Sequence, residues 1–190
     1  MVQIINCFFC YINDNRHEQS KLHFAKIMKL IIMRHGQAEQ ISSPDAARVL
    51  TSLGEKQSVS AGKWLQQYLG ANSVVDLALV SSYSRAEQTF LNLKRQVTVS
   101  NKQVCEDVVP NGNPQVAHDY IKVMSESNPQ LNNLLIVSHM PFVSYFLEEV
   151  LFDSQSMLFD TSSLAIVDYS LASGAGKIDT VYHPDVSHLL

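Results

Sequence analysis

The chain has 190 residues, of which 46% are hydrophobic, and a formal net charge of -4. A chain of this length can bury one good core, so we expect a single domain. The basic residues form no long block, which argues against a general affinity for nucleic acid or membrane surfaces. No apolar run approaches the roughly 20 residues that span a bilayer. The three cysteines do not make a disulfide framework, so a cytoplasmic location is expected.

The N-terminal segment differs in character from the rest of the chain. Residues 1–27 begin with an apolar run, and the first basic residue, Arg16, comes after that run. An export signal needs a basic start and a small-residue cleavage site, and neither is present. Met28 directly precedes the first predicted strand. We therefore expect residues 1–27 to be an extension, with a mis-assigned start as one explanation, and residues 28–190 to form the domain.

The N-terminal segment also contains a Cys-x-x-Cys pair, Cys7 and Cys10. Such a pair can be half of a zinc site or a redox pair. A structural zinc site needs about four ligands, and the remaining cysteine, Cys105, is isolated in the sequence. We expect neither a metal nor redox chemistry at this pair.

Strands and helices are expected to alternate from residue 29 onward. Short apolar or β-branched runs predict strands at 30–33, 74–80, 97–105, 134–137, 163–169 and 177–182. Helical periodicity or helix-start signals follow the first four of these runs. This alternation predicts a single-domain, three-layer α/β/α sandwich around a mostly parallel central sheet.

Two of the expected helices carry specific start signals. Residues 40–50 are expected to form a loop over the carboxyl end of the first strand, where Arg34 and His35 lie. Directly after this loop, Ser52-Leu53-Gly54-Glu55 has the spacing of a capping box. That helix should end at Gly70. A later helix should open at Asn113-Pro114. On that helix the spacing predicts a core face made of Val116, Tyr120, Val123 and Met124. His118 lies off this face and is expected to be exposed to solvent.

Three remote pieces of sequence place cations or imidazoles directly after predicted strands. They are Arg34-His35, Arg85 and His139. Parallel strands share one carboxyl edge, so these side chains should converge there. Two guanidiniums can hold phosphoryl oxygens by forked hydrogen bonds, while one imidazole attacks phosphorus and the other donates a proton to an oxygen. The pattern predicts phosphoryl transfer without a metal or other cofactor.

The same residues resemble a known family. Arg34-His35-Gly36, Arg85-Ala86-Glu87-Gln88-Thr89 and Ser138-His139 are similar to the three signatures of the histidine phosphatase superfamily. The short length and Leu50-Thr51-x-x-Gly54 most resemble SixA-type phosphohistidine phosphatases, and the similarity runs from Met28 to the C-terminus.

The resemblance implies a role for each matching residue. His35 would be the nucleophile that is phosphorylated and then freed by water, with Arg34, Arg85 and His139 forming the phosphate pocket. A bound phosphate would favour the protonated form of His139, from which it would donate. The implied partner is a histidine-phosphorylated protein in signal transduction, either a phosphotransfer domain or a phosphocarrier, and the enzyme is expected to be a monomer.

Two departures from the family pattern bear on the substrate. Ser81-Ser82 stands where the family commonly has Ser-Pro. The local candidates for a proton donor are Glu106 and Asp107, which are more readily explained as a solvated acidic turn. A site without a secure acid suits phosphohistidine, because the leaving imidazole has an ordinary pKa of about 6.5 and can take its proton from solvent.

Three other functions remain open from the sequence. The first is a small-metabolite phosphomonoesterase with Glu106 or Asp107 as its acid. The second is a non-catalytic phosphohistidine-binding module, although binding alone needs no nucleophile. The third is a metal hydrolase that uses His35, Glu39 and His139, which two neighbouring arginines would disfavour because they repel a cation.

Overall fold

The computed structural model describes residues 26–40, 44–153 and 156–189. The pair Cys7 and Cys10 therefore lies outside the described residues, and the division at residue 27 stays a prediction. Within the described ranges, no helix combines the length and the apolar character that crossing a membrane requires.

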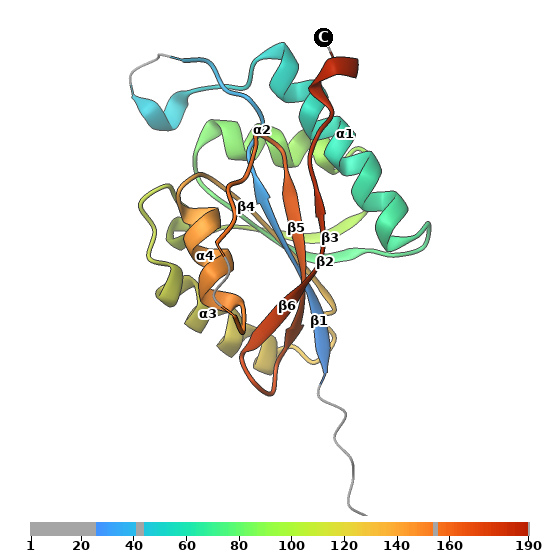
Figure 1. Ribbon diagram of the computed structural model, residues 1–190, viewed down its shortest axis with the longest axis vertical. Helices are drawn as coiled ribbons and strands as arrows, with labels where there is room; N and C mark the ends of the chain where they lie inside the picture. Colours follow the sequence, from blue (N-terminus) through green and yellow to red (C-terminus); the bar gives the residue numbers. More distant parts are fainter. Residues whose placement is uncertain (1–25, 41–43, 154–155, 190) are drawn as a thin grey trace, which may run out of the picture.

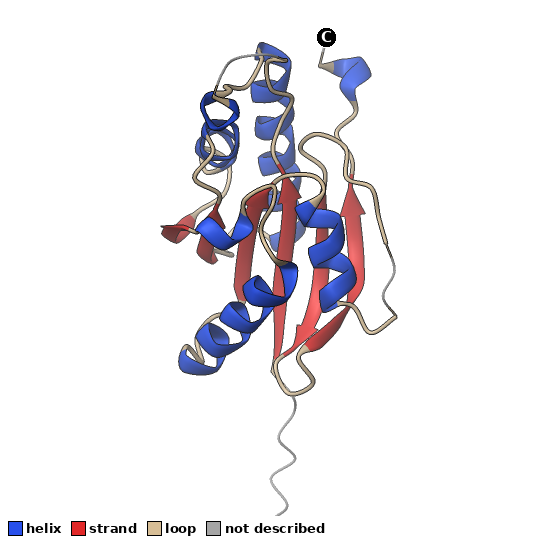
Figure 2. Ribbon diagram, turned by 90° about the vertical axis from the view of Figure 1, so that its left-hand side faces the viewer, coloured by secondary structure: helices blue, strands red, loops and turns tan. Residues whose placement is uncertain are grey.

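Six strands form one sheet, and helices lie on both of its sides (Figures 1 and 2). The strands are β1 (Ile27–Arg34), β2 (Val75–Val80), β3 (Val99–Val104), β4 (Asn133–Ser138), β5 (Leu164–Ser170) and β6 (Ala175–Tyr182). The α-helices are α1 (Ser52–Leu69), α2 (Ser84–Leu93), α3 (Pro114–Ser127) and α4 (Phe142–Val150). Short 3-10 helices are η1 (Asp45–Ala47), η2 (Glu106–Val108) and η3 (Val186–His188).

The strand order is β3-β2-β4-β1-β5-β6, which places β1 and β4 at the centre. The β1–β4, β2–β4 and β2–β3 pairs are parallel, whereas β5 runs antiparallel to both β1 and β6. The mostly parallel sheet of the predicted three-layer sandwich is thus confirmed. Each predicted strand overlaps an observed one, with ends that differ by a few residues.

Alternate side chains of β1 pack into two separate cores. Leu30 and Ile32 belong to the core beneath α3 and α4, and Ile31 and Met33 belong to the core beneath α1 and α2. Successive residues of a strand point to opposite faces, so a strand covered on both sides must be apolar throughout. This double burial explains the uninterrupted apolar run before Arg34.

The start of α1 corrects one detail of the predicted capping box. The helix begins at Ser52, but its capping residue is Thr51, whose Oγ1 accepts a hydrogen bond from the Gly54 backbone N–H at 3.1 Å. Thr51 stays extended because its own N–H is bonded to the Gln37 carbonyl at 2.9 Å. The third residue after the cap is therefore Gly54, which has no side chain to complete the box.

The core face of α3 is also shifted from the predicted one. Val123 is 62% exposed, and Val116 is exposed as well. His118 is only 8% exposed, so the prediction that it is solvated was wrong. Its Nδ1 lies 3.0 Å from Glu149 Oε1 and its Nε2 lies 2.8 Å from the Tyr169 hydroxyl, which supplies both ring nitrogens with partners. The buried face consists of Ala117, His118, Ile121 and Ser125.

We expect His118→Ala to lower the free energy of unfolding by about 2–4 kcal/mol. The change removes a buried ring and leaves the Tyr169 hydroxyl, which is fully buried, without this partner. Urea denaturation at pH 7 would measure the loss. The matched control is His188→Ala, because the His188 side chain is exposed. Equal stabilities of the two variants would show that the buried contacts of His118 are energetically unimportant.

Candidate active site

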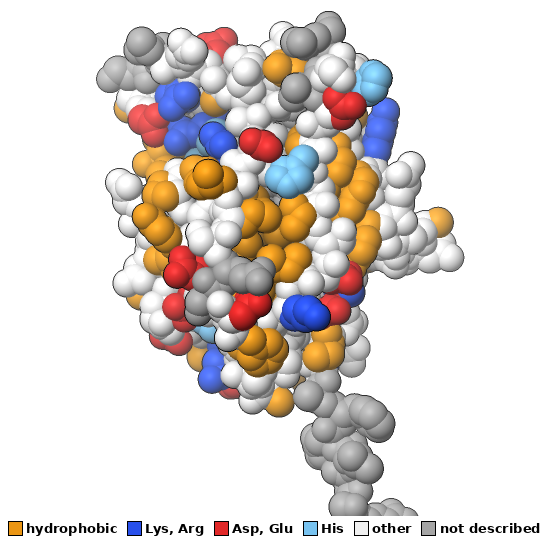
Figure 3. Space-filling model, in the orientation of Figure 1, with side chains coloured by type: hydrophobic (Ala, Val, Ile, Leu, Met, Phe, Trp, Pro, Cys, Tyr) orange, Lys and Arg blue, Asp and Glu red, His pale blue; other side chains and the backbone are white. Residues whose placement is uncertain are grey.

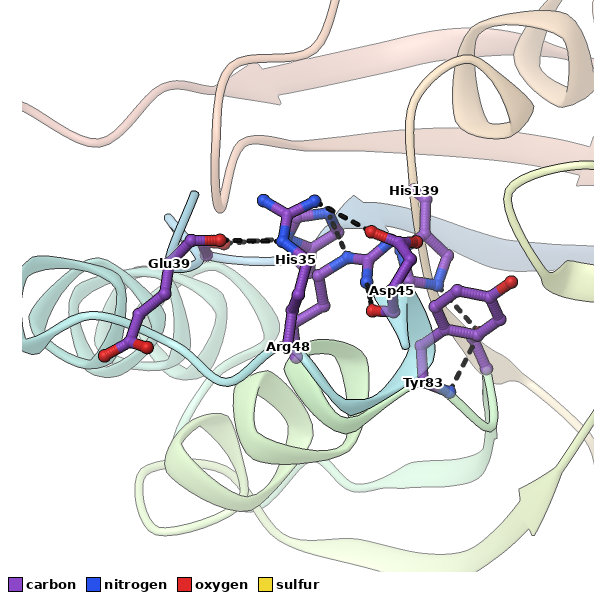
Figure 4. A network of polar contacts seen from close by, with 9 residues as sticks. His35, Glu39, Asp45, Arg48, Tyr83 and His139 are labelled. Atoms are coloured by element: carbon purple, nitrogen blue, oxygen red, sulfur yellow. Dashed lines mark hydrogen bonds and ion pairs between the residues drawn. The ribbon is translucent and has the colours of Figure 1, made fainter. Parts of the chain in front are cut away.

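Backbone hydrogen bonds join the chain segments that follow β1, β2 and β4. The N–H of His35 donates to the Ser138 carbonyl at 2.9 Å, and the N–H of Ser81 donates to the Val137 carbonyl at 3.1 Å. The backbone hydrogen bonding of β4 with β1 and with β2 thus continues one residue past the ends of β1 and β2. The segments carrying His35 and His139 are consequently brought together at the carboxyl edge (Figure 4), and Arg85 contacts His35 there, as the sequence predicted.

His35 has a defined tautomer. Its Nδ1 lies 2.7 Å from the Gly36 carbonyl oxygen, and since a carbonyl can only accept, Nδ1 carries the hydrogen. Nε2 therefore keeps its lone pair. The Nε–H of Arg85 donates to this Nε2 at 3.2 Å. The unprotonated ring nitrogen is therefore Nε2, and its lone pair faces the Arg85 guanidinium.

The Arg85 guanidinium is buried and has a separate partner for each nitrogen. Besides His35 it donates to the Asp45 backbone carbonyl at 2.8 Å and to the Asp45 carboxylate at 3.1 Å. Arg48 also donates to the Asp45 carboxylate, at 2.9 Å. Asp45 lies in the loop predicted to cover the site, but nothing in its sequence context identified it as the carboxylate that balances these arginines.

Arg34 contributes a second guanidinium at the end of β1. Its Nη1 donates to the Phe159 carbonyl at 2.7 Å. Its Nε is buried and has no hydrogen-bond partner within the described part of the chain. Figure 3 shows Lys and Arg side chains gathered beside a histidine on the upper part of one face. Arg34, Arg85 and Arg48 all lie close enough to His35 to lower its pKa, and an unpartnered buried donor among these charges is suited to an anion.

His139 is 1% exposed and lies against His35, with 4.9 Å between the ring centroids. Its Nε2 lies 2.7 Å from Ser81 Oγ, whereas its Nδ1 is buried without a partner among the described residues. The Tyr83 ring meets His139 edge-on at 4.9 Å and lies 4.8 Å from the Arg85 guanidinium carbon. Sequence reasoning missed the contacts of Ser81 and Tyr83 with His139. The only signal in the sequence was that Ser81-Ser82 stands where the family commonly has Ser-Pro.

Both histidines are neutral near pH 7. Burial, together with the charges of Arg85 and Arg34, lowers the pKa of His35 to about 3, although the hydrogen bond to the Gly36 carbonyl opposes the shift. Burial also lowers the pKa of His139 to about 2, with contributions from His35 and Arg85. A neutral His35 retains its nucleophilic lone pair, in agreement with the role that the resemblance implies.

These depressed pKa values predict a stability that falls with acidification. Between pH 6.5 and the folded-state pKa values, the unfolded chain binds protons that the folded chain does not, so stability is complete above about pH 6.5 and is lost below it. We expect urea titrations between pH 6.5 and 5 to show this loss. His139→Asn should reduce the slope by up to about 1.4 kcal/mol per pH unit. An unchanged slope would mean that His139 titrates normally in the fold.

Gly36 is required by a close approach and not by a tight turn. A Cβ on Gly36 would lie 2.5 Å from the Gly54 carbonyl oxygen, and a Cβ on Gly54 would lie 2.0 Å from the Gln37 carbonyl oxygen. The Gly36 N–H donates to Thr89 Oγ1 at 3.0 Å, and this hydroxyl donates to the Arg85 carbonyl at 2.7 Å. The two glycines thus let the segment after β1 pack closely against α1, and the hydrogen bond from Gly36 to Thr89 joins the first two motifs.

The remaining candidate carboxylates lie on the surface. Glu106 and Asp107 are exposed in η2, and Glu106 accepts a hydrogen bond from Ser82 Oγ at 2.8 Å. Figure 4 shows the Glu39 carboxylate directed away from His35. The described residues contain no group of three or more His, Cys, Asp or Glu side chains arranged to hold a metal ion. The structure therefore does not assemble the metal-ligand set that includes Glu39.

Comparison with known proteins places the chain in a family. No protein-family model matches it. The Haemophilus influenzae SixA homolog, a phosphohistidine phosphatase, is 37% identical over 128 residues, which cover 65% of this chain and 77% of that protein. Escherichia coli phosphohistidine phosphatase SixA is 30% identical over 158 residues, which cover 83% of this chain and 94% of that protein. The chain belongs to the SixA family of histidine phosphatases.

The structural comparisons agree with SixA membership. The protein histidine phosphatase SixA complexed with tungstate matches with a TM-score of 0.76 and 26% identity, covering 86% of this chain and all of that one. A second structure, named for SixA from Nakamurella multipartitia, has a TM-score of 0.68 at 20% identity, covering 85% of this chain and 98% of that one. The second match supports the SixA fold alone.

Proposed function

We propose that this chain is a phosphohistidine phosphatase that dephosphorylates a histidine-containing phosphotransfer domain or a phosphocarrier protein. The observation that carries the proposal is the state of His35, whose Nε2 is an unprotonated nitrogen held beside the buried Arg85 guanidinium. A binding module needs no such nucleophile. The names of the SixA relatives support the same activity.

The proposed reaction has two displacements at phosphorus. In the first, Nε2 of His35 forms a P–N bond as the P–N bond to the substrate imidazole breaks, and that imidazole takes a proton from solvent. In the second, water attacks phosphorus, the bond to His35 breaks, inorganic phosphate leaves, and a proton passes to solvent. Arg34 and Arg85 stabilise the negative phosphoryl oxygens in both steps.

The chemistry of the first displacement favours phosphohistidine over a phosphate ester. Transfer from one imidazole to another exchanges like bonds, so it has little thermodynamic cost and needs no strongly acidic donor. This fits a site whose candidate proton donors, Glu106 and Asp107, are exposed on η2. A phosphate ester would release an alkoxide, which is a strong base and needs a positioned general acid to protonate it.

A protein substrate is supported by the rim of the site. Leu158 is 79% exposed and directly precedes Phe159, whose carbonyl holds Arg34. An exposed apolar side chain next in sequence to the residue that contacts Arg34 can meet the surface that surrounds a protein-borne phosphohistidine. The proposal includes a monomeric enzyme in cytoplasmic signal transduction, for which the low cysteine content is suitable.

The test compares phosphate release from a histidine-phosphorylated phosphotransfer domain with hydrolysis of p-nitrophenyl phosphate, with and without a chelator. We expect fast loss from the phosphoprotein, slow ester hydrolysis and no effect of the chelator. Efficient ester cleavage with an inert phosphoprotein would replace the proposal with a small-metabolite phosphomonoesterase. Tight binding without turnover of either substrate would instead indicate a binding module.

A further inference from the structure

Ser81 is the buried polar residue in closest contact with His139, and neither the phosphate pocket nor the nucleophile includes it. Its side chain is fully buried at the end of β2. Its Oγ lies 2.7 Å from His139 Nε2 and accepts a hydrogen bond from the Tyr83 backbone N–H at 3.4 Å. The hydroxyl has one hydrogen, which needs an acceptor in this buried environment.

The hydrogen-bond count selects one tautomer of His139. If Nε2 carried the hydrogen and donated to Ser81, the buried hydroxyl hydrogen would have no acceptor among the contacts of the described residues. If Ser81 donates to Nε2 instead, that hydrogen is satisfied, and the ring hydrogen must be on Nδ1. The atom left without a partner is then a donor, the Nδ1–H of His139.

We propose that Ser81 is a positioning residue, which donates to His139 Nε2 and so holds the neutral imidazole with its Nδ1–H available to a phosphoryl oxygen. The inference rests on the proposed role of His139 in the phosphate pocket. It replaces the expectation that His139 must first gain a proton. Hydrogen bonding at one ring nitrogen fixes what the other can do, and the second donor is then present at every pH where His139 is neutral.

The buried hydroxyl also explains how the site avoids an extra charge. Arg34 and Arg85 already place two cations near His35, and both lower the pKa of His139. A protonated His139 would add a third cation before any phosphate arrives. A neutral ring that donates from Nδ1 supplies the hydrogen bond without this electrostatic cost.

The first test measures the tautomer directly. Histidine side-chain 15N shifts and two-bond 15N–1H couplings, recorded at pH 7 on the full chain, distinguish Nδ1–H from Nε2–H. We expect Nδ1–H for His139 in the wild type, a mixture or reversal in Ser81→Ala, and no change in Ser125→Ala. Ser125 is a buried serine on α3 whose hydroxyl contacts the Met28 sulfur, so it controls for loss of a buried hydroxyl. An Nε2–H signal in the wild type would overturn the proposal.

The second test follows phosphate release from the phosphotransfer domain against pH. Ser81→Ala should lower kcat by about 10- to 100-fold at pH 8, because the Nδ1 donor is no longer fixed. Because the pKa of His139 is about 2, the ring stays neutral between about pH 6 and 8, and the loss should persist over this range. Ser81→Thr, which keeps the hydroxyl, should recover most of the rate. A wild-type rate in Ser81→Ala, or no recovery in Ser81→Thr, would refute the positioning role. If the wild type released no phosphate, the proposed function would fail, while the tautomer measurement would still decide the role of Ser81.

Discussion

Replacing His35 with asparagine should lower phosphate release from a phosphohistidine protein by at least about 1,000-fold. Asparagine can retain a donor toward the Gly36 carbonyl, which His35 contacts through Nδ1 at 2.7 Å. It cannot provide a nitrogen lone pair in place of Nε2. The variant should therefore keep its fold and lose the covalent step.

A quench experiment would separate this loss from a loss of binding. The wild type, mixed with labelled phosphoprotein and denatured at pH 10, should carry an alkali-stable, acid-labile phosphoryl group, whereas His35→Asn should carry none. His188→Gln, at an exposed histidine, is the control and should behave as the wild type. Labelled protein in His35→Asn would place the intermediate on another residue and refute the assignment.

Replacing Arg85 with lysine should reduce kcat by about 100- to 1,000-fold. Three nitrogens of the planar guanidinium have separate contacts, with His35 Nε2 at 3.2 Å, the Asp45 carbonyl at 2.8 Å and the Asp45 carboxylate at 3.1 Å. A single ammonium group retains the charge but cannot reproduce this fork. The loss should therefore appear although the net charge is unchanged.

The same conservative change at a surface arginine provides the comparison for Arg85→Lys. Arg95 is exposed after α2, and Arg95→Lys should leave kcat within about twofold of the wild type, as expected for a surface site. Steady-state phosphate release and thermal unfolding should be measured on both variants. If Arg85→Lys were stable and as active as Arg95→Lys, positive charge alone would suffice, and the forked geometry would have no catalytic role.

The sequence predicted the sheet well because its central strands are covered on both faces. The uninterrupted apolar runs of β1 and β4 could hardly be solvated, and their position at the centre of the sheet explains them. The convergence of Arg34, His35, Arg85 and His139 then followed from a general property of parallel strands. These predictions needed no knowledge of individual side-chain contacts.

The predictions that failed depended on contacts between remote elements. On α3 the exposed Val116 and Val123 gave a stronger hydrophobic pattern than the small residues Ala117 and Ser125, which are actually buried. His118 is buried because α4 and β5 provide its partners, and helical spacing contains no information about them. Periodicity therefore located the helix correctly but only half of its core face, since Tyr120 and Met124 do pack against the core.

The contacts of site residues that act through others were equally hidden in the sequence. Asp45, Thr89 and Ser81 acquire their significance from partners that lie 40, 53 and 58 positions away in the chain. Serine, threonine and aspartate are also common in turns and caps for purely local reasons. Only the three-dimensional arrangement distinguishes the hydroxyl that bonds to His139 from an ordinary turn serine.

The central position of β1 and β4 has a consequence for the dynamics of catalysis. The two strands that carry His35 and His139 are hydrogen-bonded to a neighbouring strand on each side, whereas β3 and β6 lie at the outer edges of the sheet. Amide hydrogens at the sheet centre should therefore exchange only through global unfolding, while those of the outer strands exchange through local opening. The outer strands can thus fluctuate while the distance between the imidazoles of His35 and His139 stays fixed.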